Sequence, residues 1–430
     1  LAVVNPYTGD TIATVARGGT DDVDAAVAEA LRHLPPPPAH ERAAILERAA
    51  RLVAERAETF ARTICLEAGK PIKQARGEPA RCTTSPAGAG PHGVVLQEPV
   101  GVVGAISPFN FPLNLVAHKV APAIAAGCPV VLKPASANAR KDAGLPEGFL
   151  SVVLGGGGDG GDSIVRHPDV PLISFTGSPE VGWGIRAQAP RKHVALELGN
   201  STPAIVMADA DLELAAQRLA ASGFTHAGQS CISVQRVYVH RDVATAFTDL
   251  FAAAVDGLVT GDPMDEDPDV GPVIARGAHE RILDWVDEAR RSGAGVILGG
   301  TDGGGTIPPT VREGITPRMR VSHDEVFGPV VGLATFSSVD EAIDLANGSP
   351  YGLQAGIFTA RADRAVGWAR RLHFGGVTIN ETPTFRADQQ PYGGVKDSGN
   401  TREGPRYAVR TMTEPRLVLM RLPSAGSDGV

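Results

Sequence analysis

The spacing of apolar residues changes along the chain. In the first hundred residues it has a helical period, with Val23, Val27 and Leu31 on one face of a helix that opens at Thr20. A second helical pattern runs from Glu41 to about Gly69. From Pro99 onward, short apolar runs predict strands at residues 102–106, 129–132, 151–154, 172–175 and 204–207. Because helical segments separate these strands, we expect a parallel sheet in an α/β domain.

The second half of the chain repeats this alternation. Helical patterns occur at residues 211–224, 242–257, 277–291, 339–346 and 361–372, and strand patterns at 236–239, 296–298, 330–336, 355–358 and 377–379. They predict a second α/β domain. A last apolar run at 415–422 predicts a strand beyond this domain, which we expect to pair with another chain or with a protruding hairpin.

Composition narrows the kinds of partner. The 430 residues carry a net charge of −8 without clustered basic residues, so we expect no nucleic-acid partner. No apolar run reaches the ~18 residues that span a membrane, and the opening residues lack the charged region of a signal peptide. The widely spaced Cys65, Cys82, Cys128 and Cys231 favour reduced thiols in a cytoplasm over a disulfide framework or a metal site.

Cys231 is the first candidate for chemistry. It follows Gly228-Gln229-Ser230 in a loop between a helical pattern and a strand pattern, whereas structural cysteines usually lie in apolar runs. Loops on rigid scaffolds often carry reactive groups. A reactive thiol and a structural one are both compatible with this stretch.

Asn110 and Glu197 are candidates for supporting roles. Asn110 lies in a rigid Pro108–Leu113 turn, where its amide could donate to an oxyanion or simply bond its own backbone. Glu197 is a carboxylate in an apolar run, so it is either a general base with a raised pKa or a buried acid paired with a cation.

Other stretches suggest a phosphate-bearing ligand. Gly177 and Ser178 follow a predicted strand and open a helix, which is either an anion site or an ordinary capped helix. Lys133 ends another predicted strand, at the edge where α/β sheets bind ligands, although most lysines are simply solvated.

Together these motifs resemble the aldehyde dehydrogenase superfamily, the NAD(P)-dependent enzymes that oxidise aldehydes to acids. The most specific are Glu197–Gly199, Gly228–Cys231 and Glu325–Pro329, and the resemblance runs from Asn5 to about Met420. It implies a Rossmann-type cofactor domain, an α/β catalytic domain, and a small β oligomerisation element with a C-terminal arm. The cofactor domain is expected at residues 1–86 and 98–199, and the catalytic domain at 200–398. The oligomerisation element and C-terminal arm are expected at 87–97 and 399–430.

The resemblance also implies roles for single residues. Cys231 would be the nucleophile, Asn110 and the Cys231 backbone N–H the oxyanion donors, and Glu197 the base that hydrolyses the thioester. Because the branch that uses coenzyme A generally lacks this base, hydrolysis is favoured. The expected cofactor-binding residues are Lys133, Ser136, Phe109, Gly177, Ser178, Glu325 and Phe327.

Cofactor and substrate preferences are less sharply implied. Ser136 stands where NAD-preferring members often carry Glu, so NADP or dual use is expected beside NAD. His118 and Arg386 are placed to face the aldehyde, which suggests a small anionic or hydroxylated aldehyde. The runs 385–388 and 402–407 resemble the lactaldehyde, phosphonoacetaldehyde and non-phosphorylating glyceraldehyde-phosphate members. Alternatively, Arg386 forms a surface salt bridge.

Three features depart from the family pattern. Asn200 replaces the usual second glycine after Glu-Leu-Gly, and segments 78–98 and 136–143 are short. Intact flanking motifs favour missing residues over true deletions there. The departures leave open a catalytically impaired member, and His226 near Cys231 leaves open a Cys/His hydrolase. We expect a homodimer or homotetramer.

Overall fold

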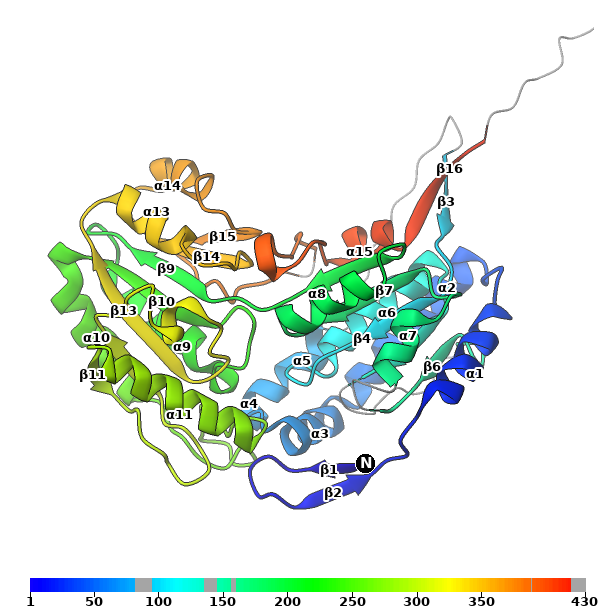
Figure 1. The fold of residues 1–430 in the computed structure, drawn as a ribbon, viewed down its shortest axis with the longest axis horizontal. Helices are drawn as coiled ribbons and strands as arrows, with labels where there is room; N and C mark the ends of the chain where they lie inside the picture. The colour runs from blue at the N-terminus through cyan, green and yellow to red at the C-terminus, as the bar shows by residue number, and fades with distance from the viewer. Residues whose placement is uncertain (82–94, 135–144, 156–159, 388, 419–430) are drawn as a thin grey trace, which may run out of the picture.

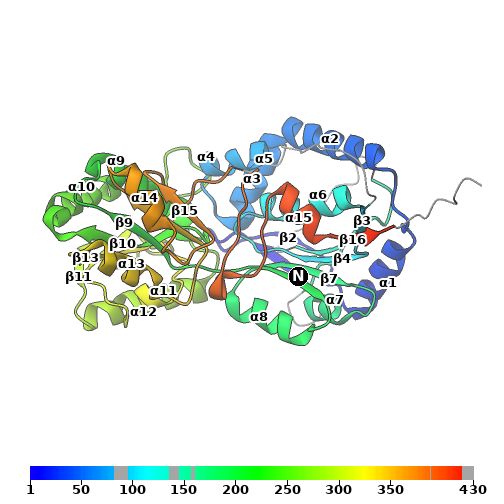
Figure 2. The ribbon, with the colours of Figure 1, turned by 90° about the horizontal axis from the view of Figure 1, so that it is seen from above.

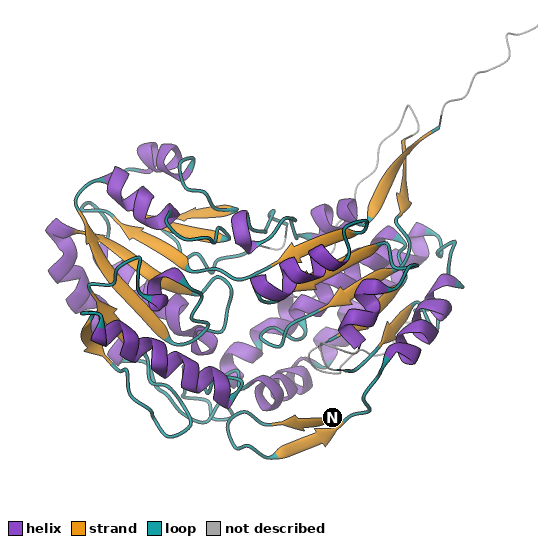
Figure 3. Ribbon diagram, in the orientation of Figure 1, coloured by secondary structure: helices purple, strands orange, loops and turns teal. Residues whose placement is uncertain are grey.

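The protein folds around two separate sheets. The computed structural model describes residues 1–81, 95–134, 145–155, 160–387 and 389–418. Ser136 and most of the two short segments therefore lie outside the described residues. Each sheet has helices on both faces, and the two units face each other across the body of the molecule (Figure 1, Figure 3).

The first sheet has five parallel strands in the order β6-β5-β4-β7-β8. The strands are β4 (Val103–Ile106), β5 (Val130–Lys133), β6 (Leu150–Val152), β7 (Leu172–Thr176) and β8 (His193–Glu197). Helices α1 (Thr20–Leu31), α7 (Asp162–Arg166) and α8 (Pro179–Gln188) pack on one face. Helix α6 (Asn114–Ala126) packs on the other, with α2 (Ala39–Glu55) and α15 (Pro405–Thr411) against it (Figure 2).

The second sheet has seven strands in the order β11-β12-β13-β10-β9-β14-β15, parallel except for β11. The strands are β9 (Thr202–Val206), β10 (Val234–His240), β11 (Gly295–Leu298), β12 (Thr310–Glu313), β13 (Val330–Phe336), β14 (Gln354–Phe358) and β15 (Gly376–Ile379). One face packs against α9 (Leu212–Phe224), α10 (Ala244–Asp256) and α11 (Arg276–Arg291), with α12 (Arg320–His323) beside α11. The other face packs against α13 (Val339–Asn347) and α14 (Ala362–Ala369).

Smaller elements join and extend these units. Strands β1 (Ala2–Val4) and β2 (Thr11–Thr14) form a hairpin, and α3 (Ala57–Ala68), α4 (Ile72–Ala75) and α5 (Gly77–Arg81) lie between the two sheets (Figure 1). Strands β3 (Val95–Pro99) and β16 (Thr413–Leu417) form an antiparallel ribbon that projects from the body (Figure 1). Single turns of 3₁₀ helix occur at η3 (Thr225–Gly228), η4 (Arg241–Val243) and η5 (Lys396–Ser398).

Most predicted elements are present, with three corrections. The strand expected at 204–207 with those of the first sheet is β9 of the second sheet, and β8, which the apolar runs did not predict, completes the first. The expected continuous helix from Glu41 is divided at Arg56, whose φ of −111° and ψ of 21° leave the helical range. The last strand begins at Thr413 and pairs with β3 within the same chain, which confirms the hairpin alternative for this strand. Both sheets are α/β as expected, and their strands place the candidate residues at facing edges.

Candidate active site

Cys231 lies at the end of an unusual turn. His226 and Ala227 both have φ of 53°, and Gly228 follows at 69°, so three successive residues are left-handed. Only glycine fits at the third position, because a Cβ on Gly228 would come 2.1 Å from the carbonyl oxygen of Gly328. The turn therefore packs closely against Gly328 and places Cys231 just before β10.

Gln229 fixes the same turn from inside the protein. Its side-chain Nε2 donates to the carbonyls of His226 and Pro272, at 3.3 and 3.4 Å, and its Oε1 accepts from the Ile274 N–H at 2.8 Å. Gln229 is 1% exposed. A buried amide with these partners holds the backbone in one geometry. Gln229 therefore supports the turn that positions the Cys231 thiol.

Asn110 binds directly to this turn. Its Nδ2 donates to the Gln229 carbonyl at 2.9 Å, and the residue is 3% exposed. An amide nitrogen carries two hydrogens, so one is used by Gln229 and the second is available to an atom bound near Cys231. Two residues that are far apart in the sequence, Asn110 and Cys231, are thereby brought to one place.

A buried ion pair supports the loop that carries Asn110. Oε1 of Glu78 accepts from the backbone N–H groups of Leu113 and Asn114, at 3.0 and 2.9 Å, where α6 begins. Oε2 accepts from Nζ of Lys70 at 2.9 Å, and Nζ also lies 3.7 Å from the ring centroid of Phe111. Lys70 and Glu78 are 2% and 3% exposed, so this loop is clamped from within the core.

The thiol of Cys231 contacts a phenol. Its Sγ lies 3.1 Å from the hydroxyl oxygen of Tyr392. Burial raises the pKa of Cys231 to about 12, the bond to Tyr392 acts in the opposite direction, and the negative charges of Glu325 and Glu197 add to the increase. The ring of His226 packs instead against Phe111, with centroids 6.2 Å apart. No described contact pairs His226 with the thiol, which weakens the Cys/His hydrolase alternative.

Glu197 is buried at the end of β8. It is 4% exposed, and within the described part of the chain neither carboxylate oxygen has a hydrogen-bond partner. Its Oε1 lies close to Gly393, since a Cβ added to that glycine would be only 2.7 Å away. Gly393 follows Tyr392, which contacts the Cys231 thiol, so Glu197 and the thiol border the same segment. Burial and the charge of Glu403 raise the pKa of Glu197 well above its ordinary value. A carboxyl group in this state is suited to accept a proton.

A cluster of charged side chains lies behind Glu197. Glu403 binds Nδ1 of His118 and Nη2 of Arg386, both at 3.2 Å, and lies 3.7 Å from Nζ of Lys119. Burial would raise the pKa of Glu403, but His118, Lys119 and Arg386 together hold it well below its usual value. Lys119 is 1% exposed and also donates to Thr176 at 2.6 Å.

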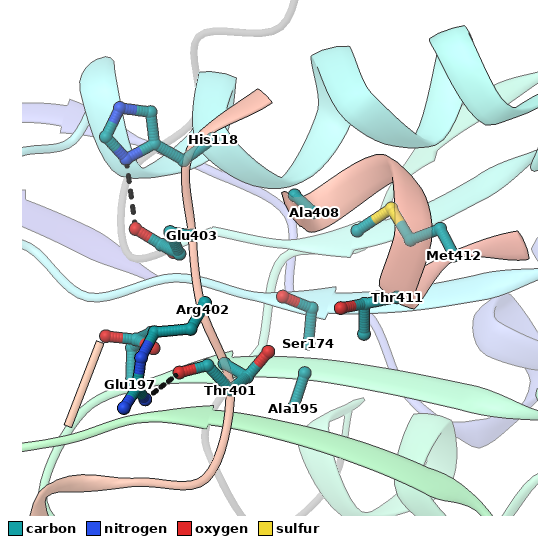
Figure 4. Close-up of a pocket in the computed structure, with 10 residues that line it drawn as sticks. All are labelled: His118, Ser174, Ala195, Glu197, Thr401, Arg402, Glu403, Ala408, Thr411 and Met412. Carbon is teal, nitrogen blue, oxygen red and sulfur yellow. Dashed lines mark hydrogen bonds and ion pairs between the residues drawn. The ribbon is translucent and has the colours of Figure 1, made fainter. Parts of the chain in front are cut away.

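Between the two carboxylates lies a small cavity of about 20 Å³. Glu197, Glu403 and His118 are among the residues that line it, and Figure 4 shows His118 bonded to Glu403 at its rim. The volume of the cavity is close to that of one water molecule, and the surface exposed inside it is mostly apolar.

The expected dinucleotide residues lie at one edge of the first sheet. Lys133 ends β5, and Gly177 and Ser178 follow β7, two strands away across β4. Ser178 is the N-cap of α8 and accepts from the Val181 N–H at 3.4 Å, with Pro179 in the first turn. These positions fit a dinucleotide, because phosphates bind at helix N-termini and at the carboxyl ends of parallel strands.

Glu325, Phe327 and Phe109 lie on the side of Cys231. Oε1 of Glu325 accepts from the Asn200 N–H at 2.9 Å, and burial raises its pKa to about 7. The rings of Phe109 and Phe327 meet edge-to-face with centroids 6.0 Å apart. A Cβ on Gly199 would lie 2.1 Å from Oε2 of Glu325, which explains a glycine at that position.

Asn200 does not crowd the site. Its Nδ2 donates to Thr202 Oγ1 at 2.7 Å and to the Gln354 carbonyl at 3.1 Å, so the side chain is directed into β9 and β14. Its backbone N–H remains available to Glu325. The departure from the family glycine is therefore accommodated without loss of space beside Glu197.

Several residues of this site were not singled out from the sequence. Tyr392, Lys119 and Glu403 are the main ones, and nothing in their spacing marks them as neighbours of Cys231 or Glu197. Lys70 and Glu78 likewise carry no signal of their pairing. Among the described residues no cluster of His, Cys, Asp and Glu could hold a metal ion, and no helix is both long and apolar enough to cross a bilayer.

Comparison with known proteins identifies the class. The sequence profile of the aldehyde dehydrogenase family matches residues 1–418. The chain is 42% identical to a 3-sulfolactaldehyde dehydrogenase of Priestia aryabhattai, over 98% of this chain and 95% of the relative. This alignment has 455 positions, more than the 430 residues here, so the relative carries residues that this chain lacks.

Two solved structures are also similar. Aldehyde dehydrogenase 21 of Physcomitrella patens, in complex with the product succinate, has a TM-score of 0.92 and 39% identity, covering 98% of this chain and 95% of that one. Glyceraldehyde-3-phosphate dehydrogenase GapN of Methanocaldococcus jannaschii, complexed with NADP, has a TM-score of 0.91 and 36% identity, covering 97% and 98%. The chain belongs to the aldehyde dehydrogenase family, and the fold and family expected from its motifs are confirmed.

Proposed function

We propose that this protein oxidises a small anionic or hydroxylated aldehyde to its carboxylic acid with NAD or NADP, through a thioester on Cys231. The observation that carries the proposal is the bond between Asn110 and the turn of Cys231, beside a buried Glu197 without a hydrogen-bond partner among the described residues. A nucleophile, an oxyanion donor and a base are the groups that this reaction requires.

The first step is attack by sulfur. The Cys231 thiolate adds to the aldehyde carbon and forms a thiohemiacetal, whose oxygen carries the developing negative charge. The second N–H hydrogen of Asn110 and the Cys231 backbone N–H stabilise that oxygen. Each such donor lowers the activation barrier by about 3 kcal/mol. The hydrogen bonds from Leu113 and Asn114 to Glu78 keep Asn110 in place.

The cofactor residues proposed from the sequence are Lys133, Ser136, Gly177 and Ser178 for the adenosine and phosphate end, with Glu325, Phe109 and Phe327 beside the nicotinamide. A nicotinamide held by these residues would supply the acceptor for the hydride of the thiohemiacetal carbon. Glu325 would offer carboxylate oxygens to a ribose, and the paired rings of Phe109 and Phe327 would contact the nicotinamide.

Hydrolysis completes the reaction. Glu197 removes a proton from a water molecule, whose oxygen attacks the thioester carbon, and the Cys231 thiolate leaves as the acid is released. Burial and the charge of Glu403 raise the pKa of Glu197, which makes it a stronger base than an exposed carboxylate.

The preference for an anionic substrate is proposed from Arg386. Its guanidinium, which stays protonated in proteins, lies 4.0 Å from the ring centroid of Tyr392, whose hydroxyl touches the Cys231 sulfur. Only the Tyr392 side chain therefore lies between the Arg386 guanidinium and the Cys231 thiol. The guanidinium is buried and paired with Glu403, not part of a surface salt bridge, and His118 lies on the same carboxylate. The relatives named for sulfolactaldehyde and glyceraldehyde-3-phosphate act on such aldehydes.

Organisation and location are part of the same proposal. We assign residues 1–86 and 98–199 to the cofactor domain, 200–398 to the catalytic domain, and 87–97 with 399–430 to oligomerisation in a homodimer or homotetramer. The projecting β3–β16 ribbon, with Leu417 65% exposed, supports this assignment. The cysteines Cys65, Cys128 and Cys231 are free, which supports a cytoplasmic enzyme.

The test is an aldehyde panel with NAD+ and NADP+, in which absorbance of the reduced cofactor is followed. We expect kcat/KM to be highest for aldehydes that carry a phosphate, sulfonate or carboxylate group. Arg386→Ala should lower kcat/KM for these at least tenfold and change that for propionaldehyde much less. Arg361→Ala is the control, because this guanidinium pairs with Asp363 at the surface. Equal losses for charged and neutral aldehydes would refute the role of Arg386.

A further inference from the structure

Tyr392 is fixed from several sides. Its backbone forms an antiparallel bridge with Glu403, in which its N–H donates to the Glu403 carbonyl at 3.1 Å. The side chain is 6% exposed and packs in a small cluster with Ile232 and Leu353, against which Cys231 also lies. The guanidinium of Arg386 covers the ring. The phenolic oxygen therefore has little freedom to leave the Cys231 sulfur.

The direction of the Tyr392–Cys231 hydrogen bond depends on the charge of the sulfur. A neutral thiol is a weak donor and a weak acceptor. A thiolate has no hydrogen, so in that state the phenol must donate, and a bond to a charged atom is the stronger one. A cation over the ring draws electron density from the phenol and makes its O–H a better donor. The contact thus favours the ionised form of the sulfur.

We propose that Tyr392 is a positioning residue for the nucleophile, which holds the sulfur of Cys231 and stabilises its thiolate by donating the phenolic hydrogen. This inference rests on the proposed role of Cys231. Burial of Cys231 works against ionisation, and among the causes that shift its pKa the bond to Tyr392 is the largest that lowers it. The hydrogen bond from Tyr392 therefore partly offsets the effect of burial, which disfavours the thiolate.

The bond acts at two points in the reaction. Before attack it raises the fraction of thiolate, and during attack it weakens because negative charge moves from sulfur to the aldehyde oxygen. After hydrolysis the thiolate leaves, and the phenol donates to it again. The proton of Tyr392 stays on Tyr392 throughout, so no group is oxidised or reduced by this residue.

The experiment is alkylation of the enzyme without cofactor by iodoacetamide. Modification of the Cys231 peptide is followed by mass spectrometry between pH 7 and 9.5 in wild type and Tyr392→Phe. Below the thiol pKa the rate follows the thiolate fraction. We expect Tyr392→Phe to be slower about tenfold or more at every pH, as for loss of a hydrogen bond to a charged atom.

The control separates this role from simple packing. Tyr238→Phe removes another buried phenol, which accepts from Arg236 at 3.0 Å and donates to the Leu345 carbonyl at 3.2 Å. It should leave the alkylation of Cys231 unchanged. If Tyr392 only filled space, Tyr392→Phe would alkylate at the wild-type rate, or faster because the thiol is less covered, and either result would overturn the proposal. Circular dichroism and the unfolding temperature verify that both variants are folded.

The role of Cys231 in aldehyde oxidation and the role of Tyr392 can be tested separately. Aldehyde oxidation by Cys231→Ala at the wild-type rate would overturn the proposed function. The alkylation rates of wild type and Tyr392→Phe would still report whether the phenol stabilises the thiolate.

Discussion

Glu78 offers a demanding test of how the oxyanion donor is positioned. Glu78→Gln keeps an oxygen that can accept from the backbone N–H groups of Leu113 and Asn114, but it removes the carboxylate partner of Lys70. Because both Lys70 and Glu78 are almost fully buried, the variant removes a carboxylate from beside a buried ammonium group. The side chain at position 78 is then no longer fixed by Lys70, so it holds the loop that carries Asn110 less firmly.

The magnitude follows from the burial of this pair. Breaking one partner of a buried ion pair costs about 3–5 kcal/mol of unfolding free energy, whereas removing both charges costs much less. Lys70→Met combined with Glu78→Gln should therefore be more stable than Glu78→Gln alone. A donor displaced by about 1 Å can lower the rate on the order of 10²-fold, so we expect kcat/KM of Glu78→Gln to fall by about ten- to a hundredfold.

Two assays check this account. Urea unfolding measures the stability, and reduced cofactor formation measures the rate. The rates are compared in Glu78→Gln, Asn110→Ala and the double variant, where the losses should not add because both act on one donor. Glu280→Gln is the matched control, since this exposed carboxylate pairs with Arg276 on the surface of α11. Additive losses in kcat/KM, or a stability unchanged within about 0.5 kcal/mol, would refute the clamp.

Further predictions concern the buried charges and Asn200. Glu403→Gln removes a negative charge that raises the pKa of Glu197, so the pH at which the deacylation rate rises should move down. Lys119→Met removes a positive charge that lowers the same pKa, so the pH at which the rate rises should move up. A stopped-flow deacylation profile that shifts opposite to its prediction would contradict the role given to that charge. Asn200→Gly loses the side-chain bonds made to β9 and β14, so urea unfolding should show a loss of about 1–2 kcal/mol. Its kcat should be unchanged, and a large fall would contradict this.

The fold was predictable because strong local patterns agree with it. Short apolar runs with helices between them predicted a parallel sheet and a second α/β domain. The carboxyl ends of β5 and β7 then place Lys133 and Ser178 at one edge of the first sheet. The division of the helix at Arg56 was not predictable, since the apolar period continues across it. The pairing of β3 with β16 depends on residues more than 300 positions apart, and periodicity does not report such contacts.

The site was predictable in part for a similar reason. Cys231, Asn110 and Glu197 are conspicuous because each is a polar group where the local pattern calls for a turn or an apolar run. Tyr392 and Glu403 are different, because their importance arises from what they touch. The bond from Tyr392 to Cys231 joins residues 161 positions apart, and only the packed structure reveals it.

The central claim is that an acyl group is carried by Cys231 and released with the help of Glu197. Glu197→Gln should react with the best aldehyde of the panel and NADP+ or NAD+, and release about one equivalent of reduced cofactor per active site. Mass spectrometry of the quenched protein should then show the acyl mass on the Cys231 peptide. An unmodified peptide together with sustained turnover by this variant, or by Cys231→Ala, would contradict the mechanism.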